Sequence, residues 1–161
     1  MKPRKAKIVR KTNETDISVE IDIDGTGKYS VDTGIAFLNH MLELFSRHSC
    51  IDAKIKAKGD LEVDAHHTVE DLGLTLGTAV DKALGDRKGI TRYGLGVIPM
   101  DEALCEVALD LGGRPYLVYQ MANTRKKIDN FDVGLVEEFF RAFTVQGRMN
   151  LHISQVYGKD P

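Results

Sequence analysis

The residues with the clearest chemical capacity stand together in residues 64–71, which have the sequence DAHHTVED. On a helix that turns by about 100° per residue, Glu70 lies ~40° from His66 and ~60° from His67, so either imidazole can pair with this carboxylate. The two imidazoles diverge by ~100°, which favours two metal ions that take one histidine each. The alternative is a solvated helix N-terminus, where Glu70 and Asp71 interact favourably with the helix dipole.

Two further residues of metal-ligating type occupy equivalent helical positions. His40 lies ~155° from the centre of its helix's apolar stripe, so a core position is not expected for it. Glu138 is in the same phase on a second, similar helix. Imidazole and carboxylate ligands without a thiolate favour Mn, Fe, Co, Ni or Zn, and octahedral Mn where oxygen contributes. The sequence therefore predicts a pair of metal sites formed by His40, His66, His67, Glu70 and Glu138.

Two arginines stand beside glycines, Arg92 in GITRYG (residues 89–94) and Arg114 in LGGRP (residues 111–115). An arginine offers a planar, bidentate fork to an oxyanion, and flanking glycine lets a ligand approach the backbone. A phosphate site is one interpretation, and a pair of ordinary surface arginines is the other. Glu14, just before a strand-like segment, is a candidate general base.

The elements that must position these residues form an internal repeat. Apolar stripes typical of amphipathic helices run through residues 35–45 and again through residues 133–143. Residues of N-cap type, Asp32-Thr33 and Asn130, precede the two stripes. Alternating, strand-like segments follow at residues 51–57 and 149–153. We therefore expect a single domain, residues 1–161, made of two copies of one unit, residues 1–88 and 89–161.

Each copy predicts two or three strands, a helix, a strand and a second helix, which is a β-β-α-β-α half-domain in outline. Together the copies predict an α/β fold of the α+β sandwich kind. In the first copy the last helix should run from about Ala65 to Leu84. The second copy lacks this helix before Pro161, which would leave an apolar sheet face uncovered. We therefore expect the natural protein to be longer, with a second His-His-x-x-Glu motif beyond this point.

Composition narrows the class of protein. The chain has 161 residues, of which 42% are hydrophobic and 29% charged, and its net charge is -2. These values are typical of a soluble globular domain and give no support to a nucleic-acid surface. The sequence shows no secretory signal and no apolar run near the ~18 residues of a membrane span. Cys50 and Cys105, which form no CxxC motif, favour a reducing cytoplasm.

Taken together, these motifs resemble the imidazoleglycerol-phosphate dehydratase family of histidine biosynthesis. The resemblance runs along the whole chain and includes residues 10–15 (RKTNET), 33–41 (TGIAFLNHM), 64–71, 89–94, 99–103 (PMDEA), 111–115, 136–140 (VEEFF) and 151–153 (LHI). It implies a metal-dependent lyase that dehydrates D-erythro-imidazoleglycerol phosphate to imidazole acetol phosphate.

The resemblance also implies roles for individual residues. Two Mn²⁺ ions per active site would be held by His40, His66, His67 and Glu70, with Glu138 where some members have a histidine ligand. Glu14 would be the acid/base and would contact the substrate, Arg92 and Arg114 would bind its phosphate, and His48 would lie in its pocket. The family resemblance further implies trimers that assemble into a large hollow homo-oligomer with active sites between subunits.

The main alternative is a dinuclear metallohydrolase that acts on a phosphorylated small molecule. Such an enzyme would hold its two metals with the same types of ligand and activate a water that bridges them. It would not explain two arginines that bind a phosphate far from the metals. A ferritin-like bundle would need four long helices, whereas this chain alternates strands and helices. We expect a cytoplasmic enzyme with a phosphorylated imidazole substrate and without nucleic-acid or membrane partners.

Overall fold

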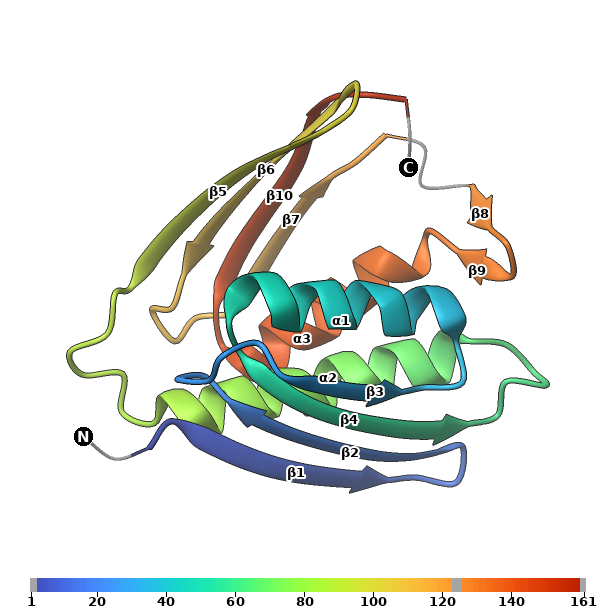
Figure 1. Cartoon of the computed structure of the whole chain (residues 1–161), viewed down its shortest axis with the longest axis horizontal. Coiled ribbons are helices and arrows are strands. Elements are labelled where there is room, and N and C mark those ends of the chain that lie inside the picture. The colour runs from blue at the N-terminus through green and yellow to red at the C-terminus, as the bar shows by residue number, and fades with distance from the viewer. Residues whose placement is uncertain (1–2, 123–125, 160–161) are drawn as a thin grey trace.

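The computed structural model describes residues 3–122 and 126–159, which fold as two successive halves (Figure 1). The first half consists of β1 (Lys5–Lys11), β2 (Thr15–Asp22), β3 (Tyr29–Asp32), α1 (Ala36–Ser49), β4 (Asp52–Gly59) and α2 (His66–Leu84). The second half consists of β5 (Tyr93–Met100), β6 (Ala103–Asp110), β7 (Tyr116–Gln120), β8 (Lys127–Ile128), β9 (Phe131–Asp132), α3 (Leu135–Gly147) and β10 (Asn150–Tyr157). Among the described residues, no helix is long and apolar enough to cross a membrane.

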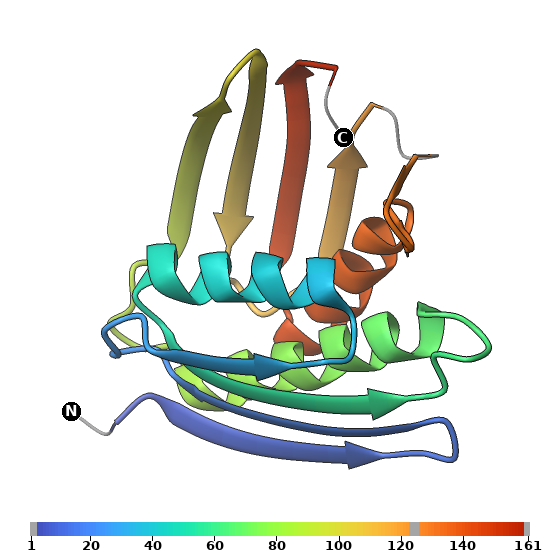
Figure 2. The same cartoon turned by 45° about the vertical axis from the view of Figure 1, so that its right-hand side comes forward.

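The two halves repeat one sheet topology. The first sheet, sheet A, has the order β1-β2-β4-β3, and the second, sheet B, has the order β5-β6-β10-β7. β3 pairs in parallel with β4, and β7 pairs in parallel with β10. The other pairs in the two sheets are antiparallel. Figures 1 and 2 show the helices in the angle between the sheets. The predicted α/β class is confirmed. Each half has a third sheet strand, β3 or β7, ahead of its first helix, within the two or three that the sequence predicts.

Sheet A packs one face against α2. Ile17 and Val19 of β2 and Ile55 of β4 are fully buried, as are Val69 and Leu72 of α2. Burial at every second residue of β2 and at helical spacing along α2 places these side chains on facing surfaces. Burying each of them stabilises the fold by roughly 1.5–3 kcal/mol. This contact therefore fixes α2, and the motif at its N-terminus, against sheet A.

Two glycines let α2 lie close to α3. A Cβ on Gly73 would lie 2.6 Å from the carbonyl oxygen of Phe139, and a Cβ on Gly77 would lie 2.5 Å from that of Phe143. Both distances are shorter than real Cβ contacts, so only glycine permits this separation of the helices. The first half therefore holds the second through a close helix–helix contact.

Arg87 joins the two halves just beyond the end of α2. Its guanidinium donates to the carbonyl oxygens of Leu111 and Arg148, both at 2.8 Å, and of Gly147 at 2.7 Å. It also donates to Asp81 Oδ1 at 2.5 Å. Because the last carbonyls of a helix have no partner within the helix, Arg87 satisfies the C-terminus of α3 from the other half of the chain.

Sheet B is covered only in part. Leu151 and Ile153 of β10 are buried, whereas Ile98 and Met100 of β5 are 64% and 60% exposed. Within the described residues, α3 is the only helix of the second half. In sheet A, helix α2 covers one face of β1. In the described part of the chain, the equivalent face of β5 in sheet B has no such helix over it and carries apolar side chains that are exposed to solvent.

The predicted helix caps are wrong. The residues before α1 and α3 are Ile35 and Gly134, and neither helix has a side-chain cap. The Thr33 hydroxyl accepts the Ile35 N–H at 3.2 Å and donates to Asn39 Oδ1 at 2.7 Å, so it closes the turn before α1. Asn130 lies in the turn between β8 and β9. Thr33 therefore stabilises the turn before α1 and does not cap the helix.

Candidate functional site

The first turn of α2 carries His66, His67 and Glu70, each with a side chain 43–46% exposed. Gly59 at the end of β4 allows this turn to lie close to sheet A, because a Cβ there would come within 1.9 Å of Thr68 Oγ1. His66 Nε2 lies 3.6 Å from Glu70 Oε2. The two imidazole planes are nearly perpendicular, at 78°, with ring centroids 5.9 Å apart. The motif is thus a fixed, half-exposed set of nitrogen and oxygen donors.

His67 is oriented by a carboxylate from the loop before the helix. Its Nδ1 lies 2.9 Å from Asp60 Oδ2. This hydrogen bond is the main cause of a raised pKa of His67, which burial opposes and the charges of Asp60, Asp64 and Glu14 increase. With the Nδ1 proton held by Asp60, the Nε2 of neutral His67 is the nitrogen free to bind another group.

Most of the predicted site residues lie at one end of the molecule. α1, α2 and α3 all begin at this end, and the turn between β1 and β2 lies there as well (Figures 1 and 2). We call it the histidine end. It includes Glu14 in the β1–β2 turn, His40 in α1, His66, His67 and Glu70 in α2, and Glu138 in the first turn of α3.

A groove with a volume of about 950 Å³ opens at the histidine end. It is lined by the first residues of all three helices and by the β8–β9 ribbon. His66 contributes to the lining, together with Asp64, Lys127, Asp129 and Asp132. A small polar molecule therefore has room beside the first turn of α2.

The donors at the histidine end fit a metal such as Mn²⁺ in kind, because imidazole and carboxylate are ligands that it accepts. In the described residues, however, no three His, Cys, Asp or Glu side chains converge on one point. His66–Glu70 and His67–Asp60 are two separate pairs. One copy of the chain therefore offers only part of a coordination sphere.

The remaining predicted residues, His48, Arg92 and Arg114, lie towards the opposite end, which we call the arginine end. His48 is in the last turn of α1, Arg92 immediately precedes β5 and Arg114 follows β6 (Figure 1). α2 has 19 residues and separates the two ends by roughly 28 Å. Within one copy, Arg92 and Arg114 therefore lie far from His66 and His67.

Arg92 binds the carboxylate of Asp110, and the charge of Arg114 also acts on that carboxylate. Arg92 donates to Asp110 through Nε at 2.6 Å and through Nη2 at 2.9 Å. The hydrogen bond from Arg92 lowers the pKa of Asp110, and the charges of Arg92 and Arg114 lower it further. Gly112 lies against this pair, because a Cβ there would come within 2.5 Å of Arg92 Nη2 and the guanidinium would have to move. The arrangement concentrates cationic donors that a phosphate can use.

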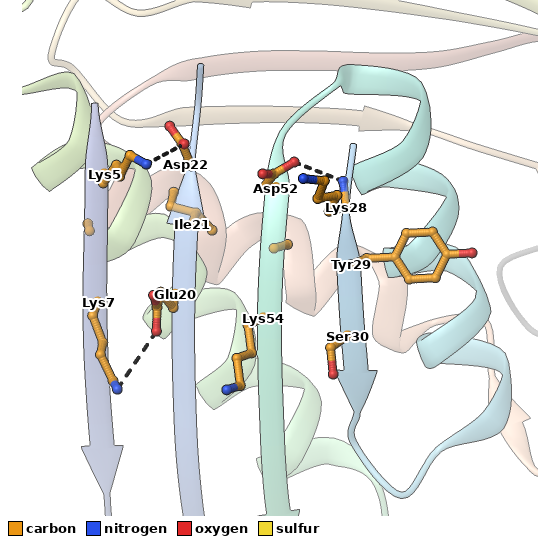
Figure 3. A pocket seen from close by; sticks show the side chains of 12 residues that line it. Lys5, Lys7, Glu20, Ile21, Asp22, Lys28, Tyr29, Ser30, Asp52 and Lys54 are labelled. Carbon is orange, nitrogen blue, oxygen red and sulfur yellow. Dashed lines mark hydrogen bonds and ion pairs between the residues drawn. The ribbon is translucent and has the colours of Figure 1, made fainter. Parts of the chain in front are cut away.

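A second cavity, of about 520 Å³, lies on the outer face of sheet A (Figure 3). Lys5 pairs there with Asp22 at 2.8 Å, and Lys7 with Glu20 at 3.7 Å. The described residues that line it include none of the predicted site residues. This face is a charged, solvent-facing surface and not the candidate site.

Two residues that support the site, Asp60 and Asp71, were not predicted from the sequence to do so. Asp60 lies in a loop seven residues before His67, where no periodic pattern marks it. Asp71 is buried and accepts hydrogen bonds from Arg10 and Thr15, although the sequence offered only a helix-dipole role for it. An acidic residue shortly before a paired-histidine motif is the one signal that could have indicated Asp60.

Comparison with known proteins shows the family of the chain. Residues 33–161 match the imidazoleglycerol-phosphate dehydratase family. The imidazoleglycerol-phosphate dehydratase of Acetivibrio thermocellus is 53% identical over 157 residues, which cover 98% of this chain and 80% of that protein. The enzyme of Caldanaerobacter subterraneus subsp. tengcongensis is 54% identical, over 96% of this chain and 80% of its own length.

A solved structure gives the same result. The imidazoleglycerol-phosphate dehydratase of Staphylococcus aureus subsp. aureus N315 superposes with a TM-score of 0.86 at 37% identity, over 97% of this chain and 86% of that chain. The fold and these relatives define the protein as a hydro-lyase of histidine biosynthesis that acts on a small molecule. The chain belongs to the imidazoleglycerol-phosphate dehydratase family.

Proposed function

We propose that this enzyme dehydrates D-erythro-imidazoleglycerol phosphate to imidazole acetol phosphate, with two Mn²⁺ ions in each active site. The gathering of imidazole and carboxylate donors at the histidine end is the observation that carries the proposal. A cytoplasmic location is part of the proposal and is supported by two free thiols, Cys50 and Cys105.

His40, His66, His67, Glu70 and Glu138 would hold the metal. When bound, Mn²⁺ would lower the pKa of the substrate's imidazole N–H and orient its ring. Asp60 fixes the Nδ1 proton of His67 and leaves Nε2 for ligation. The different partners of His66 and His67, Glu70 and Asp60, are consistent with separate ions.

Glu14 would move the protons of the elimination. Its carboxylate would take a proton from a carbon of the glycerol-phosphate side chain and then deliver that proton to the hydroxyl on the neighbouring carbon, which leaves as water and returns Glu14 to the carboxylate. The resulting enol then becomes the ketone, imidazole acetol phosphate. Glu14 is exposed in the β1–β2 turn, and its charge contributes to the raised pKa of His67, which supports a role for it beside the donors.

The active site would lie between copies of the chain in a homo-oligomer, built from trimers into a larger hollow assembly. The separation of the histidine and arginine ends supports this part of the proposal, because one substrate needs both. Exposed apolar side chains on sheet B support it as well: Leu95 is 71% exposed and Ile98 64%. Large exposed apolar areas are typical of protein–protein contacts.

The test is a dehydratase assay on purified protein stripped of metal with EDTA. We expect no turnover of imidazoleglycerol phosphate without metal and recovery when Mn²⁺ is added. Formation of the ketone product without release of inorganic phosphate supports the proposal. Turnover that does not depend on added metal would contradict the metal role, and release of inorganic phosphate would indicate a metallohydrolase instead.

A further inference from the structure

The turn that carries Glu14 is tied to α2 by a buried carboxylate. Asp71 is 8% exposed, and each of its carboxylate oxygens has a separate donor. Oδ1 accepts from Arg10 Nε at 2.8 Å, and Oδ2 accepts from the Thr15 hydroxyl at 2.5 Å. Thr15 is itself 3% exposed, so this hydrogen bond is shielded from water. Arg10 and Thr15 lie on the two strands that flank the turn, β1 and β2.

The turn is also closed internally. The Thr12 hydroxyl accepts the N–H of Glu14 at 3.1 Å and the N–H of Thr15 at 2.9 Å. The Thr12 N–H donates to the Thr15 carbonyl at 2.9 Å. The backbone of Glu14 is therefore held in place, although its side chain is exposed. Fixing Thr15 on α2 consequently fixes the position from which the Glu14 carboxylate projects.

Asp71 occupies a position in α2 that makes this link relevant to catalysis. It directly follows Glu70 and lies one helical turn after His67. The helix that presents the predicted metal ligands thus also anchors the turn that presents the predicted acid/base. A shift of about 1 Å between reacting groups can cost roughly 100-fold in rate.

We propose that Asp71 is a positioning residue, which acts through the Thr15 hydroxyl to hold Glu14 at a fixed place relative to the donors of α2. Arg10 donates to the other oxygen of Asp71 and orients the carboxylate for this purpose. The inference rests on the proposed acid/base role of Glu14. It adds that the role depends on a buried hydrogen bond between β2 and α2.

The test compares kinetics of the full chain with Mn²⁺ and imidazoleglycerol phosphate. Thr15→Val removes the donor to Asp71 while keeping the size of the side chain, and Thr15→Ser restores the hydroxyl. We expect Thr15→Val to lower kcat by about 10- to 100-fold, with little change in KM. Thr15→Ser should recover most of this loss, and Asp71→Asn should resemble Thr15→Val.

Thr75→Val is the matched control. The Thr75 hydroxyl is also buried in this region, but it donates at 2.6 Å to the backbone carbonyl of Asp71. Loss of that hydrogen bond should lower the thermal midpoint and leave kcat near wild type. A similar kcat loss in Thr75→Val and Thr15→Val would show that both changes act only through stability and would overturn the proposal.

A double-mutant cycle with Glu14→Gln separates positioning from other effects. If Thr15 acts through Glu14, Thr15→Val should cause no further kcat loss in the Glu14→Gln background. An undiminished further loss would overturn the positioning role. Normal turnover of Glu14→Gln alone, or a wild-type chain without activity, would instead contradict the proposed function.

Hydrogen exchange tests the link without using activity. Thr15→Val should speed exchange of the Glu14 and Thr15 amides, whereas Thr75→Val should not. Unchanged exchange of both amides in Thr15→Val would show that the turn is held independently of Asp71, which would overturn the proposal.

Discussion

At the scale of single residues, the candidate site depends on carboxylates that would not touch a substrate. Asp60 accepts a hydrogen bond from His67 Nδ1, while Asp71 holds the turn of Glu14. Hydrogen bonds of the first kind fix the tautomer of a ligating histidine and increase its basicity. Loss of Asp60 should therefore affect metal binding before it affects the fold.

Asp60→Ala is expected to weaken Mn²⁺ binding by about 10- to 100-fold, because the His67 ring loses the acceptor that orients it. Isothermal titration calorimetry on the metal-free protein measures this change. Asp16→Ala is the control, since Asp16 pairs only with Lys11 on the outer face of sheet A. Equal affinities in wild type and Asp60→Ala would remove Asp60 from the metal site.

Arg92→Ala and Arg114→Ala should each raise KM for imidazoleglycerol phosphate by about 10-fold or more, because each removes a charged donor to phosphate. Mn²⁺ affinity should stay near wild type, since the arginine end lies far from His66 and His67. Steady-state kinetics and metal titration together test this expectation. Weaker metal binding with an unchanged KM would contradict the phosphate role.

At the scale of elements, the contact between α2 and α3 sets where the histidine motif lies. Glycine costs about 1 kcal/mol relative to alanine inside a helix. The positions of Gly73 and Gly77 are explained by the α3 backbone, which leaves no space for a Cβ at either residue. Glycine lowers the helix propensity of α2 at these two positions, but it allows α2 to lie close to α3.

Gly77→Ala should therefore destabilise the protein by about 1–3 kcal/mol, despite the gain in helix propensity, because the new Cβ would overlap the Phe143 carbonyl oxygen. Denaturant unfolding followed by circular dichroism measures the change. Gly96→Ala in β5 is the control, since no atom lies within 4 Å of the Cβ position there. A Gly77→Ala variant as stable as Gly96→Ala would show that α2 and α3 can separate without cost.

At the scale of the whole molecule, the division into a histidine end and an arginine end is the main finding. A single copy presents Glu14 and the metal-type donors on one side and Arg92 and Arg114 on the other (Figures 1 and 2). A substrate with an imidazole and a phosphate needs both sets within a few ångströms. Two copies arranged with opposite ends together would supply them.

Mixing inactive variants tests this shared site. Glu14→Gln and Arg114→Ala should each have low activity alone, whereas hetero-oligomers formed by co-expression should regain activity at about a quarter of their sites. Arg92→Ala mixed with Arg114→Ala is the control and should not recover, since both residues lie at the arginine end of the same copy and both charges act on Asp110. No recovery in the first mixture would indicate that one copy supplies the whole site.

Several features of this protein follow from local sequence alone. Hydrophobic periodicity predicted a helix from about Ala65 to Leu84, and the structure has one at His66–Leu84. The same periodicity predicted the recurring half-domain, which is visible in the matching order of sheets A and B. Such patterns succeed because spacing along the chain decides which side chains share a face, and burial of that face stabilises the element.

The tertiary structure alone decided which elements meet. Thr15 and Asp71 are 56 residues apart in sequence, and their hydrogen bond exists only because β2 packs against α2. The short strands β3 and β7 lack a strong alternating pattern and are formed by pairing with β4 and β10. The separation of His66 from Arg92 is likewise set by the length and direction of α2. Residue types indicate which chemistry is possible, but the packing of distant segments decides how far apart the groups lie.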